Sequence, residues 1–125
     1  MRLRLRIRFR FRLQFERQLV DFWAYHKGVM EQLNAGQPTV KRSELHADYM
    51  AGFFLGTRKK ANPGLNLHAA GDLFSRIGDY NTGRGHHGTP DERVAASEQG
   101  FRLCYLQNRT AEYAFTAAME YVSAL

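Results

Sequence analysis

The chain has 125 residues, of which 44% are hydrophobic and 13% aromatic, a composition typical of one globular domain rather than a disordered chain. Its 18 basic and 12 acidic residues give a net charge of +6. No apolar stretch approaches the roughly 20 residues of a transmembrane helix, and no segment is a convincing signal peptide. The location is therefore unknown, with the cytoplasm as the default expectation. The single Cys104 excludes an internal disulfide framework and a multi-cysteine zinc site within one chain.

The N-terminal segment, residues 1–13, alternates arginine with large apolar residues and holds six arginines and no acid. Residues 14–125 then contain 12 basic and 12 acidic residues, so they carry no specific nucleic-acid signal. A period of two predicts a possible β-strand with the arginines on one face. We therefore expect two parts: the alternating segment 1–13, and a single, partial helical domain over 14–125.

The remaining periodicity predicts a mostly α fold with about five helices. The first ends near Asn34, with Gly36 as its stop. In the second, Ser43 is the expected cap, Gly56 the expected end, and Ala51 and Gly52 are small enough for a neighbouring helix to approach. Its expected apolar face holds Leu45, Tyr49, Phe53 and Phe54.

Three shorter helices are expected further along the chain. One spans about Asn66 to Ile77, before a glycine-rich loop over 78–88. The next begins at Thr89, because Thr89, Pro90 and Glu92 form a capping-box signal, and runs through Cys104. The last runs from Thr110 to about Ser123. The expected inner positions of the helix that begins at Thr89 are Val94, Ser97, Phe101 and Cys104. Those of the last helix are Tyr113, Ala114, Ala117 and Tyr121.

Glu44 and Asp48 are the candidate site residues. A spacing of four places both carboxylates on one helix face. A zinc site with two histidines and one glutamate takes its glutamate from such a helix, and a nearby acid can orient a histidine ligand. The pattern alone is weak, because many solvated helix faces contain it.

The segment Ser43-Glu44-Leu45-His46-Ala47-Asp48-Tyr49-Met50-Ala51-Gly52 resembles the E-x-x-A-D-x-x-A-G segment of neutral zinc metallopeptidases of the gluzincin type. A second set of residues is similar to that family's downstream G-D, H-G-T-x-x-x-R and G-F pattern. It consists of Gly78-Asp79, His87-Gly88-Thr89 with Arg93, and Gly100-Phe101. The resemblance covers about residues 13–101.

The resemblance implies part of a zincin-like helical domain that hydrolyses peptides with zinc as cofactor. It makes Glu44 the third zinc ligand and Asp48 a supporting acid beside the ligands, and it implies scaffold roles for His87, Thr89 and Arg93. Peptides would be the substrate of a complete site.

The chain departs from the family because it contains no H-E-x-x-H. Counting back from Leu13-Gln14 places that motif over Ile7–Phe11, where Ile7 and Phe11 cannot bind zinc and Arg8 cannot act as a base. We therefore expect a truncated or degenerate metallopeptidase-like protein that is inactive as written, has no catalytic residue of its own and binds no zinc tightly.

Several alternatives remain open. His68, His86 and His87 form a less favoured candidate metal set, and Cys104 is expected to be structural. Residues 1–13 could be a frame error or misassigned start, or a plain strand. They could also form a basic arm of a small helical binding protein that contacts anionic surfaces or nucleic acid. A partner chain could also supply the missing histidines, although nothing in the sequence favours this.

Overall fold

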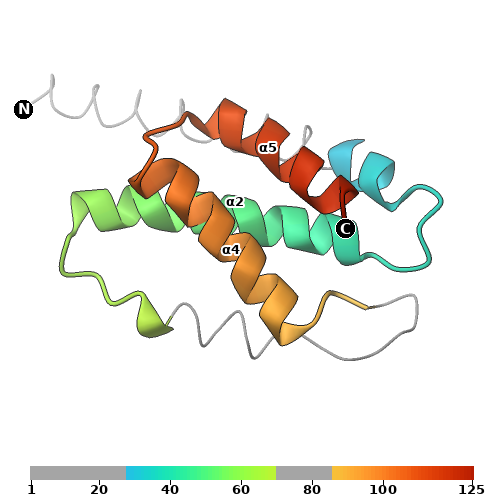
Figure 1. The fold of residues 1–125 in the computed structure, drawn as a ribbon, viewed down its shortest axis with the longest axis horizontal. Helices are drawn as coiled ribbons and strands as arrows, with labels where there is room; N and C mark the ends of the chain where they lie inside the picture. The colour runs from blue at the N-terminus through green and yellow to red at the C-terminus, as the bar shows by residue number, and fades with distance from the viewer. Residues whose placement is uncertain (1–27, 70–85) are drawn as a thin grey trace, which may run out of the picture. The chain divides into compact units, whose positions relative to one another are not determined.

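The computed structural model describes residues 28–69 and 86–125 (Figure 1). Three whole helices lie in these ranges: α2 (Lys41–Ala61), α4 (Pro90–Tyr105) and α5 (Ala111–Ser123). Residues 28–34 are also helical and are followed by Gly36 at a φ of 70°, which confirms the predicted end near Asn34. The mostly α expectation is therefore confirmed, and the described ranges contain no strand.

The number of helices differs from the expected five, because the described ranges hold four. Of the helix expected over 66–77, only His68 and Ala69 are described as helical. Two residues are too few to be counted as a helix. The rest of that helix and the possible strand in 1–13 lie outside the described residues. None of the described helices combines the length and apolar character needed to cross a membrane.

Helix α2 begins earlier and ends later than predicted. Its N-cap is Val40, which makes no side-chain cap, and the buried Ser43 hydroxyl instead donates to the Val40 carbonyl at 3.0 Å. Ser43 is therefore inside the first turn and is not the cap. Gly56 does not end the helix either, because it is a buried position in contact with Cys104, and the helix continues to Ala61.

The starts of α4 and α5 are confirmed. Thr89 accepts from the Glu92 amide at 3.2 Å, the Glu92 carboxylate accepts from the Thr89 amide at 3.2 Å, and Pro90 opens α4. Thr110 caps α5 by accepting from the Tyr113 amide at 3.1 Å. Each of these signals is complete within four residues of sequence, which explains why pattern alone could locate them.

Helices α2 and α4 are packed closely enough for their backbones to touch. A Cβ atom added at Gly52 would lie 1.8 Å from the Ser97 carbonyl oxygen, and one added at Gly100 would lie 1.8 Å from the Tyr49 carbonyl oxygen. The predicted close approach at Gly52 is thus confirmed, whereas Ala51 is exposed. The order of contacts along the pair shows that both helices run in the same direction.

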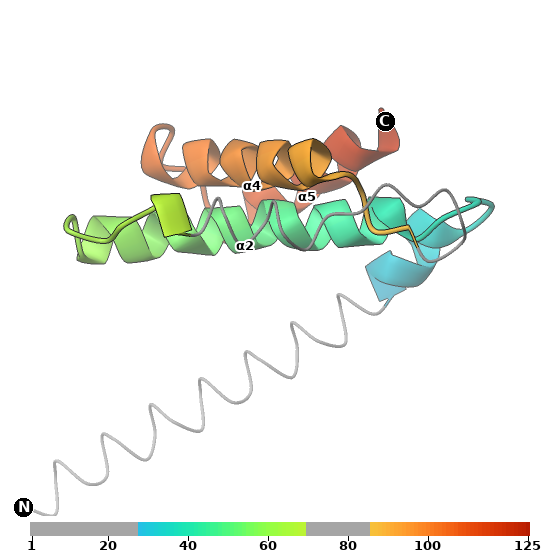
Figure 2. The ribbon, with the colours of Figure 1, turned by 90° about the horizontal axis from the view of Figure 1, so that it is seen from below.

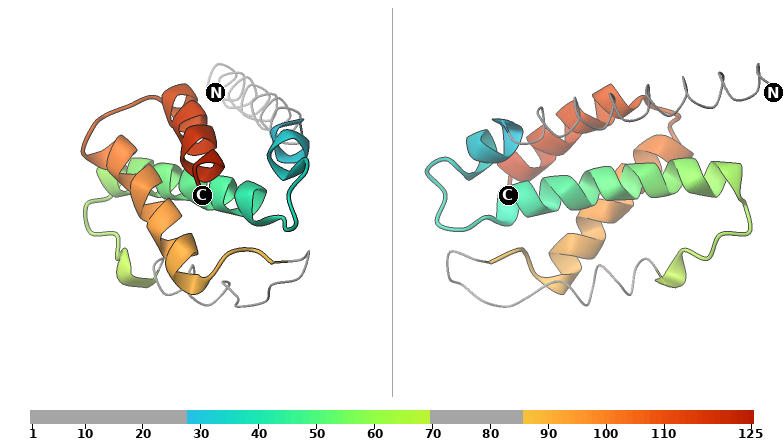
Figure 3. Two further views of the ribbon diagram at one scale, coloured as in Figure 1. Left: turned by 45° about the vertical axis from the view of Figure 1, so that its right-hand side comes forward. Right: turned by 180° about the vertical axis from the view of Figure 1, so that it is seen from behind.

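Helices α4 and α5 lie on the same side of α2, so the three form two layers (Figure 2). The C-terminal end of α5 lies beside the start of α2, where the Arg42 guanidinium donates to the Ser123 carbonyl at 3.3 Å (Figure 3). Among the predicted core positions, Leu45, Tyr49, Phe53, Ser97, Cys104 and Ala114 are buried. The predictions for Phe54 and Tyr113 were wrong, since these side chains are 42% and 47% exposed.

Candidate functional site

Glu44 and Asp48 lie one turn apart on α2, and both reach the same side chain of α4. Their environments differ, because the Glu44 side chain is 35% exposed and the Asp48 side chain only 5%. The predicted common face is therefore present, with one carboxylate at the surface and the other in the interior.

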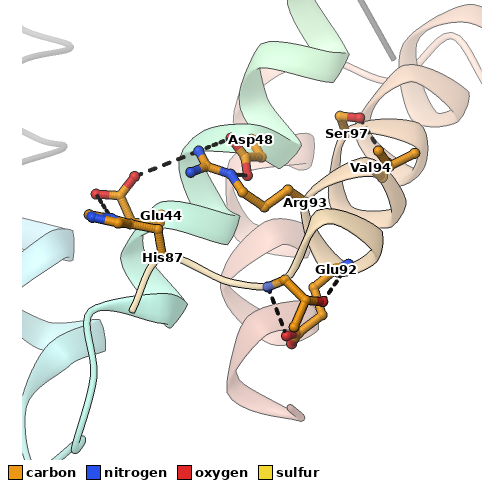
Figure 4. Close-up of polar contacts among 8 residues, drawn as sticks. Glu44, Asp48, His87, Glu92, Arg93, Val94 and Ser97 are labelled. Atoms are coloured by element: carbon orange, nitrogen blue, oxygen red, sulfur yellow. Dashed lines mark hydrogen bonds and ion pairs between the residues drawn. The ribbon is translucent and has the colours of Figure 1, made fainter. Parts of the chain in front are cut away.

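Asp48 forms a two-point ion pair with Arg93 (Figure 4). Arg93 Nε donates to Asp48 Oδ2 at 2.7 Å, and Nη2 donates to Oδ1 at 2.8 Å. Burial raises the pKa of Asp48 above 3.8, and the Arg93 guanidinium opposes that rise. The two charge-assisted hydrogen bonds from Arg93 favour the ionised form of Asp48.

Glu44 lies between two nitrogen groups that come from the other motif segment. Its Oε1 is 3.4 Å from His87 Nδ1, and its Oε2 is 3.8 Å from Arg93 Nη2 (Figure 4). His87 sits just before the Thr89 cap of α4, so the capping box positions its backbone. The partly exposed Glu44 carboxylate is oriented by these contacts and remains open to a ligand from solvent.

A zinc site needs more ligands than the described residues supply. Within 28–69 and 86–125, no group of three or more His, Cys, Asp or Glu side chains is placed to hold a metal ion. The alternative set of His68, His86 and His87 therefore does not form such a group. Because fewer than three such side chains gather at Glu44, the described residues do not fit zinc by themselves and no catalytic step can be derived from them.

The roles implied for Glu44 and Asp48 stay predictions. Asp48 accepts one bond from Arg93 on each oxygen, and a carboxylate has about four acceptor positions, so it can still accept from one further donor. Orientation of a histidine ligand by Asp48 is thus compatible with the ion pair.

Two other side chains with reactive chemistry are packed inside the helical layers. His46 is fully buried on the opposite side of α2, where its Nε2 lies 3.2 Å from the Phe115 carbonyl oxygen and its ring contacts Phe115 edge-on. The thiol of Cys104 is buried against Gly56. Both belong to the core, as expected for Cys104.

Two contacts of this site were not foreseen from the sequence: the pairing of Arg93 with Asp48 and that of His87 with Glu44. The first joins residues 45 positions apart, so no local pattern reports it. A usable signal did exist, because a carboxylate on the inner face of a helix needs a cation, and Arg93 lies on the inner face of α4.

No protein-family model, curated protein or solved structure matches this chain. The resemblance to the gluzincin segments therefore depends on the residues quoted above.

Proposed function

We propose that this chain is a partial zinc-metallopeptidase-like protein that retains the third-ligand helix, lacks H-E-x-x-H and does not hydrolyse peptides as written. The observation that supports this best is the contact between the two motif segments. Glu44 and Asp48 come from the first segment, His87 and Arg93 come from the second, and each acid touches a residue of the other segment.

This contact bears on the resemblance because the two segments were identified separately along the chain. Two chance matches have no reason to meet through their motif residues. Here the second acid of the first segment is held at two points by the arginine of the second. The pair joins α2 to α4 and leaves Glu44 near the surface. Glu44 is the position at which the resemblance implies the third zinc ligand.

The proposed inactivity follows from the register of the missing motif. The positions that would carry H-E-x-x-H are Ile7–Phe11, and none of these side chains binds zinc or accepts a proton. A metallopeptidase of this type needs both a metal-bound water and a carboxylate base.

A graft tests the proposal directly. In the full chain, Ile7→His, Arg8→Glu and Phe11→His together would restore H-E-x-x-H in the expected register. We expect the triple variant to gain stoichiometric zinc in a competition titration against a chromophoric chelator. Adding Glu44→Gln should then weaken zinc binding by on the order of 100-fold, because it removes a ligand.

Glu120→Gln is the matched control, since it makes the same chemical change at an exposed position on α5. Tight zinc and peptidase activity in the unaltered chain would overturn the proposed inactivity. If adding Glu44→Gln to the triple variant left its zinc affinity unchanged, the proposed role of Glu44 would be overturned.

A second candidate function is supported by the charge distribution. All of the net charge of +6 lies in residues 1–13, as expected for a basic arm that contacts anionic surfaces. Deletion of residues 1–13 should abolish binding to anionic vesicles and to nucleic acid. Binding that survives the deletion, or that is absent before it, would remove this candidate.

A further inference from the structure

The turn between α4 and α5 lies beside the C-terminal end of α2 (Figures 1 and 2). The Lys60 ammonium donates to the Asn108 side-chain oxygen at 2.6 Å and joins the two segments. We call this region the turn surface, and it consists of Lys60, Arg102, Tyr105, Leu106, Arg109 and Tyr113.

The turn surface is basic even though residues 14–125 have no net charge. Of the eight lysines and arginines in the described ranges, five lie at 58–60, 102 and 109. Four acids, by contrast, lie at the other end of the same helix pair: Glu44, Asp48, Asp91 and Glu92. The other three cations, Lys41, Arg42 and Arg93, share that end with the acids, so the excess of basic residues on this helix pair lies at the turn surface.

Helix electrostatics account for part of this pattern. Basic residues in the last turns of α2 and α4 complement the negative ends of those helices. Arg109 is different, because it directly precedes the Thr110 cap of α5, where a positive charge opposes the helix dipole. Its side chain packs instead over the ring of Tyr113 in the first turn of α5.

The same surface exposes large apolar side chains. Leu106 is 67% exposed, Tyr113 is 47% exposed and Tyr105 is 39% exposed. Exposed apolar groups gathered among cations are a mark of interaction sites, and tyrosine and arginine are the residues most enriched in such sites.

These side chains are also held in place by one another. The Arg109 guanidinium lies 4.5 Å from the centre of the Tyr113 ring, and Tyr105 stacks on Phe101 with ring centres 5.1 Å apart. An ordered surface loses little conformational entropy when it binds. Each tyrosine ring already has one face in contact, which leaves less room for stacking of nucleic-acid bases.

We propose that the turn surface binds an acidic polypeptide segment that carries a large apolar side chain. The carboxylates of that segment pair with Lys60, Arg102 and Arg109, and its apolar side chain packs on Leu106 and Tyr113. Nothing in this proposal depends on zinc or on Glu44, so it stands or falls separately from the proposed function.

The test uses the full chain, labelled with ¹⁵N, and three probes. The first is a short peptide rich in glutamate that contains leucine and phenylalanine, the second is the same peptide with every glutamate replaced by glutamine, and the third is oligo(dT). Because residues 1–13 attract anions too, the binding position is read from the shifts of individual backbone amide signals.

We expect the acidic peptide to shift the signals of residues 58–60 and 102–113, and the glutamine peptide to leave them unchanged. Arg102→Glu with Arg109→Glu should weaken this binding on the order of tenfold, and Leu106→Asp should weaken it several-fold. Arg42→Glu is the control, since it reverses a charge at the far end of α2 and should leave the affinity within about twofold.

Circular dichroism verifies that each variant is folded, and Leu106→Asp changes a side chain that is 67% exposed. Shifts confined to residues 1–13 would overturn the proposal, as would an affinity that the turn-surface variants do not change. Tighter binding of oligo(dT) than of the acidic peptide at these residues would overturn it in favour of nucleic acid.

Discussion

Asp48 and Arg93 lie 45 residues apart in the sequence and form a two-point ion pair, with side chains that are 5% and 8% exposed. The pair holds α2 against α4 near the N-terminal ends of both helices. Because Arg93 also approaches Glu44, the same guanidinium connects the buried carboxylate with the surface carboxylate.

The first prediction concerns this pair. Asp48→Asn removes the closest counter-charge of the buried Arg93 guanidinium and should lower the free energy of unfolding by about 3 kcal/mol. Urea unfolding followed by circular dichroism measures this. Glu44→Gln is the matched control and should cost less than about 1 kcal/mol, because its contacts are longer and more exposed. Equal losses in the two variants would contradict the structural role of the pair.

The second prediction concerns the closest approach of α2 and α4. Gly100→Ala places a Cβ atom 1.8 Å from the Tyr49 carbonyl oxygen, so the two backbones must separate. We expect a loss of about 2 kcal/mol or more in the free energy of unfolding. Gly28→Ala is the control, since this helical glycine has no atom within 4 Å of its Cβ position. The control should be neutral or slightly stabilising because alanine favours helices.

The third prediction concerns acid stability and Glu92. Burial alone would raise the pKa of Glu92, but its hydrogen bond and ion pair with Lys41 and its bonds with Thr89 outweigh burial and lower the pKa below 4.5. Glu92 therefore binds its proton more weakly in the folded state than in the unfolded state. Its contribution to stability is complete above pH 4.5 and is lost as the pH falls through the lowered value.

This dependence is measurable by substitution. The difference in unfolding free energy between the unaltered chain and Glu92→Gln should be largest above pH 4.5 and should shrink on acidification. Lys41→Met removes the main group that lowers this pKa, so it should reduce the acid dependence. A difference that stays constant with pH would contradict the assignment.

The fourth prediction concerns the start of α4. Thr89→Ala removes the acceptor of the Glu92 amide and should lower the free energy of unfolding by about 1 kcal/mol. Thr89→Ser retains a hydroxyl acceptor and should preserve most of that stability. Thr116→Ala is the control, because Thr116 is exposed within α5 and its hydroxyl donates only weakly, at 3.4 Å, to the Glu112 carbonyl. A larger loss at Thr116 than at Thr89 would contradict the capping role.

The sequence predicted those features of the fold that are determined by neighbouring residues. The cap at Thr89, the start of the last helix at Thr110 and the helix end near Asn34 each depend on a few adjacent residues, and all were correct. Leu45, Tyr49 and Phe53 were also recognised as buried, because their spacing gives one helix face.

The errors arose where a contact that the apolar pattern does not report overrides the expected local arrangement. Gly56 was predicted to end the helix. It lies instead inside α2, where the absence of a side chain lets Cys104 of α4 pack against it. Tyr113 looked like part of an apolar face, yet its ring packs with Arg109 at the surface. For the candidate site, the common face of Glu44 and Asp48 was predictable, but the partners of both acids were not.

The Asp48–Arg93 pair also affects what a motif can say about the history of this chain. Because removal of either partner would take away the closest counter-charge of the other buried group, selection for a stable fold alone is enough to retain both residues. A chain without catalytic chemistry would keep this aspartate and this arginine for as long as it folded in this way. At these two positions, a motif match reports on architecture, and activity has to be judged from other residues.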